Sequence, residues 1–204
     1  MKALFLSLCL AFPLAVSAQN GATKPKLTLP TRSSQAAKPS ATPQPAEPTK
    51  PATAAKPAQR GELSSDVAKV LANIFLLYTE ALNFHWNVVG PQFLVLHEFF
   101  GKQYEALAEA VDDLAEQIRI MDATPPSTLQ EFLDMATLKE PSENLNDRQM
   151  LQKYLADTQT ILSSLPALIA RATEVGDDGT ADLLIERQRF HSKTAWMIRA
   201  ILQK

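Results

Sequence analysis

Two histidines and two carboxylates in the middle of the chain, His85, His97, Asp112 and Glu116, are side chains of the kind that bind transition metals. Asp112 and Glu116 are four residues apart, so on a helix they share one face at about 6 Å and can hold one cation together. His97 precedes Asp112 by fifteen residues, which return it to nearly the same face but place it about 22 Å away along the helix. These side chains therefore cannot all meet within one chain.

A two-fold axis between two copies of the chain would remove this conflict. If the helix packs antiparallel against its own copy, His97 of one chain lies opposite Asp112 and Glu116 of the other, because a two-fold interface is self-complementary. Imidazole together with carboxylate suits iron, manganese or zinc better than calcium, which prefers oxygen ligands alone. The spacing therefore predicts a metal site shared between subunits.

The helices that must position these residues are indicated by the apolar pattern. The Gly-Pro pair at 90–91 ends a first helix over residues 63–89 and allows the chain to turn. A second helix over 92–121 then runs back beside the first, so we expect His85 and His97 to be neighbours. The first helix has apolar side chains spaced three and four apart, which predicts a buried stripe of Val67, Val70, Leu71, Ile74, Phe75, Tyr78, Leu82 and Trp86.

The rest of the chain predicts further helices. Residues 129–135 form a short helix in the long connection between the second and third bundle helices. Asn146 caps the third helix, and Gln149 stands at the position that completes a capping box. This helix runs to about Glu174, with a bend at Pro166, where a backbone donor is missing.

The last helix follows after a short turn. Gly176 ends the third helix, and Asp177 or Asp178 begins a fourth that ends near Leu202. No internal repeat and no strand-like alternation occurs in the sequence. The expected fold is therefore all-α, a four-helix bundle with one short helix in the connection between helices two and three.

Several spaced motifs in this order resemble the Dps family of mini-ferritins. They are NFHWNVVG at 83–90, followed by Phe93 and LHE at 96–98, then DDLAE at 112–116, GDDGTADLL at 176–184 and KTAWM at 193–197. The resemblance covers about Leu63 to Leu202, and it is highly specific because the motifs recur in the family's order. It implies a ferritin-like bundle that assembles into a hollow homododecamer.

The resemblance also implies a function. Members of this family oxidise Fe(II), preferentially with hydrogen peroxide, and store the ferric mineral inside the shell, which protects against oxidative stress. It implies that His85 and His97 of one subunit form the ferroxidase centre with Asp112 and Glu116 of its two-fold mate. It further suggests a negative funnel for entering iron around a three-fold axis, made of Asp177, Asp178 and Asp182.

One position departs from the family pattern. Many members carry an acidic residue four positions after the second histidine, where it helps to hold a second iron, and this chain has Gly101 there. The second iron site is therefore expected to be weak. Glu98 points about 100° away from His97 on the helix, so it is a poor substitute.

The first eighteen residues predict export. Met1 to Ala18 contains Lys2, an apolar core and a Val-Ser-Ala ending with the small residues of a signal-peptidase site. The core is shorter than the roughly 20 residues that span a bilayer, so we expect cleavage before Gln19 rather than a membrane span. Cys9 lacks the small preceding residue of a lipoprotein signal. The mature protein is thus expected in the periplasm or outside a bacterial cell.

Residues 19–61 predict a disordered tail ahead of the domain at 62–204. The tail holds eight of the fourteen prolines and almost no large apolar side chains, so it cannot bury enough surface to fold. Its seven basic residues against Glu47 give a net charge of +6, whereas the domain carries −9, from twelve basic and twenty-one acidic residues. Such an arm could bind DNA or an anionic envelope polymer through phosphates or other anions. The simpler interpretation is a solvated spacer, because export separates it from the chromosome.

Other features favour structural roles. His191 has no partner at ligand spacing and is expected to be a surface or core residue. Trp86 and Trp196 are expected to pack, although Trp86 beside His85 could intercept oxidising equivalents. A diiron bundle of the bacterioferritin type would carry paired Glu-x-x-His motifs, and none occurs here. The main alternative to an iron store is therefore a DNA- or polyanion-binding protein that acts through its tail.

Overall fold

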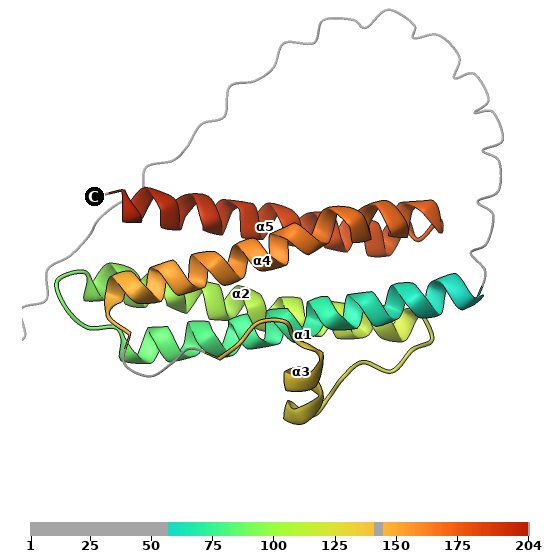
Figure 1. Cartoon of the computed structure of the whole chain (residues 1–204), viewed down its shortest axis with the longest axis horizontal. Helices are drawn as coiled ribbons and strands as arrows, with labels where there is room; N and C mark the ends of the chain where they lie inside the picture. The colour runs from blue at the N-terminus through green and yellow to red at the C-terminus, as the bar shows by residue number, and fades with distance from the viewer. Residues whose placement is uncertain (1–56, 141–144, 204) are drawn as a thin grey trace, which may run out of the picture. The chain divides into compact units, whose positions relative to one another are not determined.

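The computed structural model describes residues 57–140 and 145–203, and these form an all-helical bundle. The predicted signal peptide and residues 19–56 of the predicted tail lie outside the described residues, whereas residues 57–61, which were assigned to the tail, belong to a helix. The helices are α1 (Pro57–Asn87), α2 (Phe93–Ile120), α3 (Leu129–Met135), α4 (Asp147–Glu174) and α5 (Asp178–Leu202). Figure 1 shows four long helices side by side, with the short α3 beside α1. The predicted fold class is confirmed, including the bounds of the short helix.

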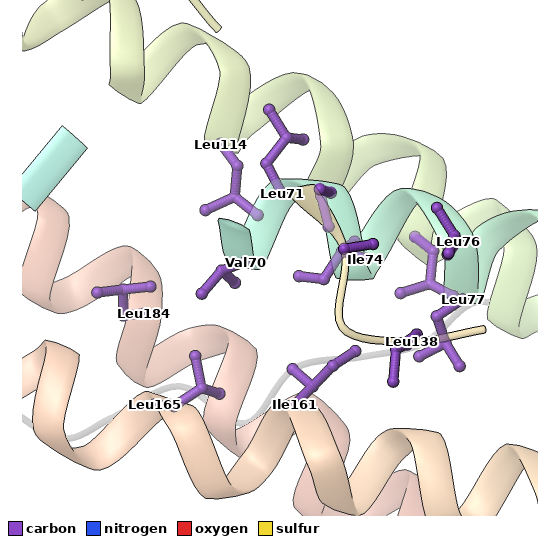
Figure 2. Packing of buried hydrophobic residues seen from close by; sticks show 14 of the residues in the cluster. Val70, Leu71, Ile74, Leu76, Leu77, Leu114, Leu138, Ile161, Leu165 and Leu184 are labelled. Atoms are coloured by element: carbon purple, nitrogen blue, oxygen red, sulfur yellow. The ribbon is translucent and has the colours of Figure 1, made fainter. Parts of the chain in front are cut away.

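The bundle consists of two helical hairpins. α1 packs along α2 and α4 packs along α5, while α1 also contacts α4 and α3. The core forms where the apolar faces of the long helices meet, as Figure 2 shows for Leu71 on α1, Leu114 on α2, Ile161 on α4 and Leu184 on α5. The four-helix arrangement therefore follows from one apolar stripe on each long helix.

The turns use the residues that the sequence indicated. Gly90 and Gly176 both adopt positive φ, at 102° and 76°, a conformation that glycine reaches without steric cost. After α4, the Gly176 N–H donates to the Thr173 carbonyl and the Asp177 N–H donates to the Ala172 carbonyl. This pair of bonds is a Schellman motif, which satisfies the last carbonyls of the helix. Gly176 thus ends α4 as predicted.

The helix starts also match local signals, with one exception. Asn146 accepts from the Gln149 N–H and the Gln149 side chain accepts from the Asn146 N–H, so the predicted capping box is present. α4 then continues without interruption through Pro166. α1, however, begins at Pro57 rather than near Leu63, because proline suits a first helical turn. The added turn is exposed at 58–62, so the apolar pattern did not reveal it.

The long connection between α2 and α4 is fixed to α1 by one buried side chain. Asn73 Oδ1 accepts from the backbone N–H groups of Thr137 and Leu138, at 2.8 and 3.0 Å. Phe132 of α3 stacks on Phe75 of α1, with ring centroids 4.0 Å apart. These contacts hold α3 against α1 although most of its surface is exposed.

α1 is also the described helix that is long and apolar enough to cross a membrane. Of its most apolar window, 67% is buried inside the bundle. Such burial is typical of the core helix of a bundle.

Candidate metal centre

His85 and His97 are in direct contact where the first hairpin turns. His85 lies in the last turn of α1 and His97 in the second turn of α2. The turn at Gly90 reverses the chain, so that the two helices lie side by side. Their imidazole rings stack with centroids 3.7 Å apart and planes 20° from parallel. Both residues are half-buried. The expectation that these histidines are neighbours is confirmed.

Reciprocal hydrogen bonds orient the two rings. His85 Nδ1 lies 2.7 Å from the carbonyl oxygen of His97, and His97 Nδ1 lies 2.8 Å from the carbonyl oxygen of His85. A carbonyl oxygen only accepts hydrogen bonds, so both Nδ1 atoms must carry the hydrogen. Nε2 is then the nitrogen of each ring that carries a lone pair, and the ring orientation is fixed by backbone carbonyls, as is common for histidines in metal sites. Both candidate ligands are therefore held in place by a carbonyl of the neighbouring helix.

Two aromatic rings and a glycine surround the pair. Phe93 stacks on His97, with centroids 5.0 Å apart, and Tyr104 meets His85 edge-on at 5.2 Å and 71°. A Cβ atom added at Gly101 would lie 3.4 Å from Cε1 and Nδ1 of His85. Gly101 is thus directly beside the His85 imidazole.

Asp112 and Glu116 lie farther along α2 and are exposed. Within the described ranges of a single chain, no three His, Cys, Asp or Glu side chains gather at a spacing that could hold a metal. The chain therefore presents its histidines and its carboxylates as two separate surface groups. The prediction that a second copy joins them is compatible with this arrangement and remains a prediction.

Several apolar side chains around the turn between α1 and α2 are exposed. Val89, Leu94 and Val95 are exposed to 73%, 77% and 63%, and Phe93 beside them is 40% exposed. Exposed apolar side chains in one contiguous group are typical of an interface. Phe93 stacks on His97, so part of this apolar group borders the histidine pair.

The prediction that the two tryptophans pack in the core is wrong for the single chain. Trp86 is 69% exposed and Trp196 is 60% exposed. The row that stays buried on α1 is Val70, Leu77 and Phe84, at a spacing of seven. Trp86 follows Phe84 by two residues, about 200° around the helix, so it faces outward.

The three aspartates near the α4–α5 turn have different roles in the chain. Asp177 accepts a hydrogen bond from the Thr180 N–H at 3.0 Å and so caps α5. Asp178 and Asp182 are exposed and four residues apart, so they share one face of α5. The capping role is confirmed for Asp177, and the iron funnel remains a prediction.

Two buried polar groups of the bundle lie outside the candidate metal centre. His191 is a core residue with 0% exposure, and neither ring nitrogen has a hydrogen-bond partner. Burial, and then the charge of Arg187, lower the pKa of His191 to about 3. The ring therefore stays uncharged in the folded protein at neutral pH. Its position in the buried row of α5, beside Leu184 and Ala195, was the only available hint.

The second buried group is a cluster of Glu80, Lys153 and Asp157. Lys153 Nζ lies 2.8 Å from Glu80 Oε2 and also bonds to Asp157. Burial raises the pKa of Glu80 to about 8, because one ammonium cannot compensate two buried carboxyl groups. The cluster links α1 to α4. Sequence reasoning missed it, although Glu80 falls between Leu77 and Phe84 on the buried side of α1.

The chain is similar to known proteins over most of the bundle. A family model described as a ferritin-like domain matches residues 67–204. General stress protein 20U of Bacillus subtilis is 36% identical over 141 residues, which are 69% of this chain and 97% of that protein. DNA protection during starvation protein 2 of Bacillus anthracis is 33% identical, over 67% of this chain and 93% of that one.

A solved structure shows the same similarity in three dimensions. It is that of a Dps protein from Vibrio cholerae O1, described as a member of a broad superfamily of ferritin-like diiron-carboxylate proteins. It superposes with a TM-score of 0.70 at 29% identity, over 72% of this chain and 93% of the other.

Proposed function

The chain belongs to the Dps family of ferritin-like proteins, and from this membership we propose that it is a ferroxidase that oxidises Fe(II) and stores the ferric product. The observation that carries the proposal is the stacked pair His85 and His97, with both Nδ1 atoms bonded to backbone carbonyls. An Nε2 pair held in this way offers two nitrogen ligands to Fe(II), the substrate.

The remaining ligands come from a second subunit in this proposal. Asp112 and Glu116 of the two-fold mate supply the oxygen ligands, and their negative charges stabilise Fe(III) more than Fe(II) because the attraction grows with the metal charge. The exposed apolar surface at residues 89–95 forms part of the same contact and excludes water from it. Subunit pairing therefore both completes the site and favours oxidation.

We further propose hydrogen peroxide as the oxidant and a homododecameric shell as the store. Consuming peroxide and Fe(II) together removes both reactants that produce hydroxyl radical, which is the basis of protection against oxidative stress. Asp178 and Asp182 would line the iron entry with Asp177 at the subunit contacts where three α4–α5 turns meet. A size measurement of the purified protein, before and after iron loading with peroxide, tests the assembly and the storage.

Complementation between two inactive variants tests the shared site directly. One variant carries His85→Ala and His97→Ala, the other Asp112→Ala and Glu116→Ala, so each homodimer lacks half of every ligand set. A mixed dimer has one complete site and one empty site. Random exchange makes about half of all dimers mixed, so roughly a quarter of the wild-type oxidation rate should return on mixing.

The controls decide what a negative result means. Subunit exchange is verified by mass spectrometry with one variant isotopically labelled, and each variant must assemble alone. If exchange is complete and no activity returns, the ligands do not come from two chains. If either variant alone keeps the wild-type rate, those side chains are not ligands.

A polyanion-binding role for the tail is the second candidate, because residues 19–61 carry a net charge of +6 while the domain is acidic. Since α1 begins at Pro57, the segment to remove is 19–56. The truncated protein should assemble and oxidise Fe(II) normally. In gel shifts, retention of DNA by the full chain should weaken steeply with salt and disappear on truncation.

We also propose that the protein is exported and cleaved before Gln19, as the Val-Ser-Ala ending of the first segment suggests. The mature amino terminus, identified by mass spectrometry from periplasm or medium, should be Gln19. A protein recovered from the cytoplasm with Met1 in place would contradict export and would favour DNA as the partner of the tail.

A further inference from the structure

We propose that Tyr104 donates the second electron when a single Fe(II) at the histidine pair reacts with peroxide. The inference rests on the proposed ferroxidase function and assigns a redox role to a residue outside the ligand set. It follows from the number of electrons that the reaction needs and from the rings that contact His85.

The ligands of this chain favour one firmly bound iron. Two imidazoles and two carboxylates, completed by water, suffice for one iron ion. Gly101 lies beside the His85 ring, where an added Cβ atom would be 3.4 Å away, and as a glycine it offers no carboxylate for a second iron. One Fe(II) supplies one electron, whereas reducing hydrogen peroxide to water takes two. If no second electron arrives, the product is hydroxyl radical.

Tyr104 is in the right place to supply that electron. Its ring meets the His85 ring edge-on with centroids 5.2 Å apart, so the phenol ring is in direct contact with a proposed iron ligand. The other ring on the histidine pair is Phe93, which is not readily oxidised. Trp86 is 69% exposed and makes no ring contact with the pair in the described part of the chain.

The other two tyrosines are in different surroundings. Tyr78 contacts Phe75 on α1, and Tyr154 is fully buried among Phe84, Phe99 and Phe100. Tyr104 is therefore the one tyrosine of three that contacts a candidate ligand. Tyr104 is half-buried, whereas Tyr154 is fully buried, with its hydroxyl among the buried groups that lack a hydrogen-bond partner.

The proposed step is balanced in atoms and electrons. The O–O bond of one peroxide breaks as Fe(II) gives one electron and the Tyr104 phenol gives one electron and one proton. A second proton comes from solvent, and both oxygens leave as water. The products are Fe(III) and a tyrosyl radical, which the next Fe(II) and one proton reduce to tyrosine. Two Fe(II) are thus oxidised for each peroxide, and no hydroxyl radical is released.

The test uses the assembled protein, first titrated with Fe(II) without oxygen to count the iron bound at each site. With one Fe(II) per site, one equivalent of peroxide is added and the sample is frozen for electron paramagnetic resonance. We expect a radical signal that narrows when the tyrosine rings are deuterated. Tyr104→Phe should abolish this signal and raise spin-trapped hydroxyl radical several-fold per iron oxidised.

Matched variants exclude a general effect of removing a tyrosine. Tyr78→Phe also removes one phenolic oxygen, but away from the histidines, and should leave the signal and the trapped radical unchanged. Tyr104→Phe keeps the ring against His85, so folding and assembly should be preserved, which circular dichroism and mass measurement check. Gly101→Asp should weaken the radical signal if it adds a second iron, because two irons supply both electrons.

The outcomes separate this inference from the function on which it rests. If the wild type oxidises Fe(II) with peroxide but Tyr104→Phe has the same radical yield, the ferroxidase stands and the role of Tyr104 is refuted. A radical sensitive to tryptophan deuteration rather than tyrosine deuteration would likewise overturn it. If the wild type does not oxidise Fe(II), the proposed function and the inference both fail.

Discussion

The buried His191 should make the folded protein less stable as the pH falls below neutral. The ring is fully buried, and burial with the nearby Arg187 lowers its pKa from 6.5 to about 3. In the unfolded chain the same imidazole takes up a proton near its ordinary pKa, so below that pH the unfolded state binds more protons than the folded state. The stability contributed by neutral burial is therefore complete above about pH 6.5 and is lost as the pH falls toward 3.

The size of the effect follows from this difference in pKa. Each pH unit well below 6.5 costs about 1.4 kcal/mol, so going from pH 7 to pH 5 should cost about 2 kcal/mol at this site. Glu80 has the opposite effect on the free energy of unfolding. Because its pKa is raised to about 8, the folded state binds a proton at a higher pH than the unfolded state does, so its contribution to stability grows as the pH falls. The raw pH dependence of the wild type therefore combines opposing contributions.

A comparison of two proteins isolates His191. The free energy of unfolding is measured by urea denaturation at pH 7 and pH 5, for the wild type and for His191→Leu. Glu80 and all other titratable groups are present in both proteins, so their contributions cancel in the difference of differences. The wild type should lose about 2 kcal/mol more than His191→Leu over this range. Assembly is checked at each pH, because loss of subunit contacts would add its own pH dependence.

Equal pH dependence in the two proteins would refute this reasoning. It would mean that His191 is charged in the folded state or is not isolated from water. A lower stability of His191→Leu at both pH values, with the predicted difference intact, would report only on packing.

Two further substitutions test local features. Gly101→Asp places a carboxylate beside His85, since a Cβ atom there lies 3.4 Å from the ring, and should raise the number of Fe(II) bound per centre in an anaerobic titration. Gly101→Ala adds the same Cβ without the charge and should leave that number unchanged; an equal effect of both would point to packing instead. Asp122→Gly should stabilise the protein by up to about 1 kcal/mol, because Asp122 has φ 61° and its negative charge lies at the carboxyl end of α2. The urea midpoint of Asp122→Gly should rise, whereas Glu109→Gly, at an exposed position inside α2, should lower the free energy of unfolding by about 1 kcal/mol.

Signals confined to a few neighbouring residues were sufficient for the helices. The capping box at Asn146, the glycine end at Gly176 and the short helix at Leu129–Met135 all form as predicted. Capping and turn formation involve bonds between residues only a few positions apart, so the chain carries the information locally. The start of α1 at Pro57 was missed because its first turn buries nothing, and an exposed turn leaves no apolar pattern.

Spacing along the sequence also determined that His85 and His97 would be neighbours and that Asp112 and Glu116 share a face, because helix periodicity and one turn decide both. Only the tertiary structure decided how the histidines are held, by two Nδ1 bonds to carbonyls across the hairpin, with Tyr104 against one ring. It also decided that His191 is isolated in the core and that Glu80 is paired with Lys153 of another helix. The physical reason is that periodicity fixes the face on which a side chain lies, whereas its hydrogen bonds and its exposure to water depend on which distant segment packs against that face.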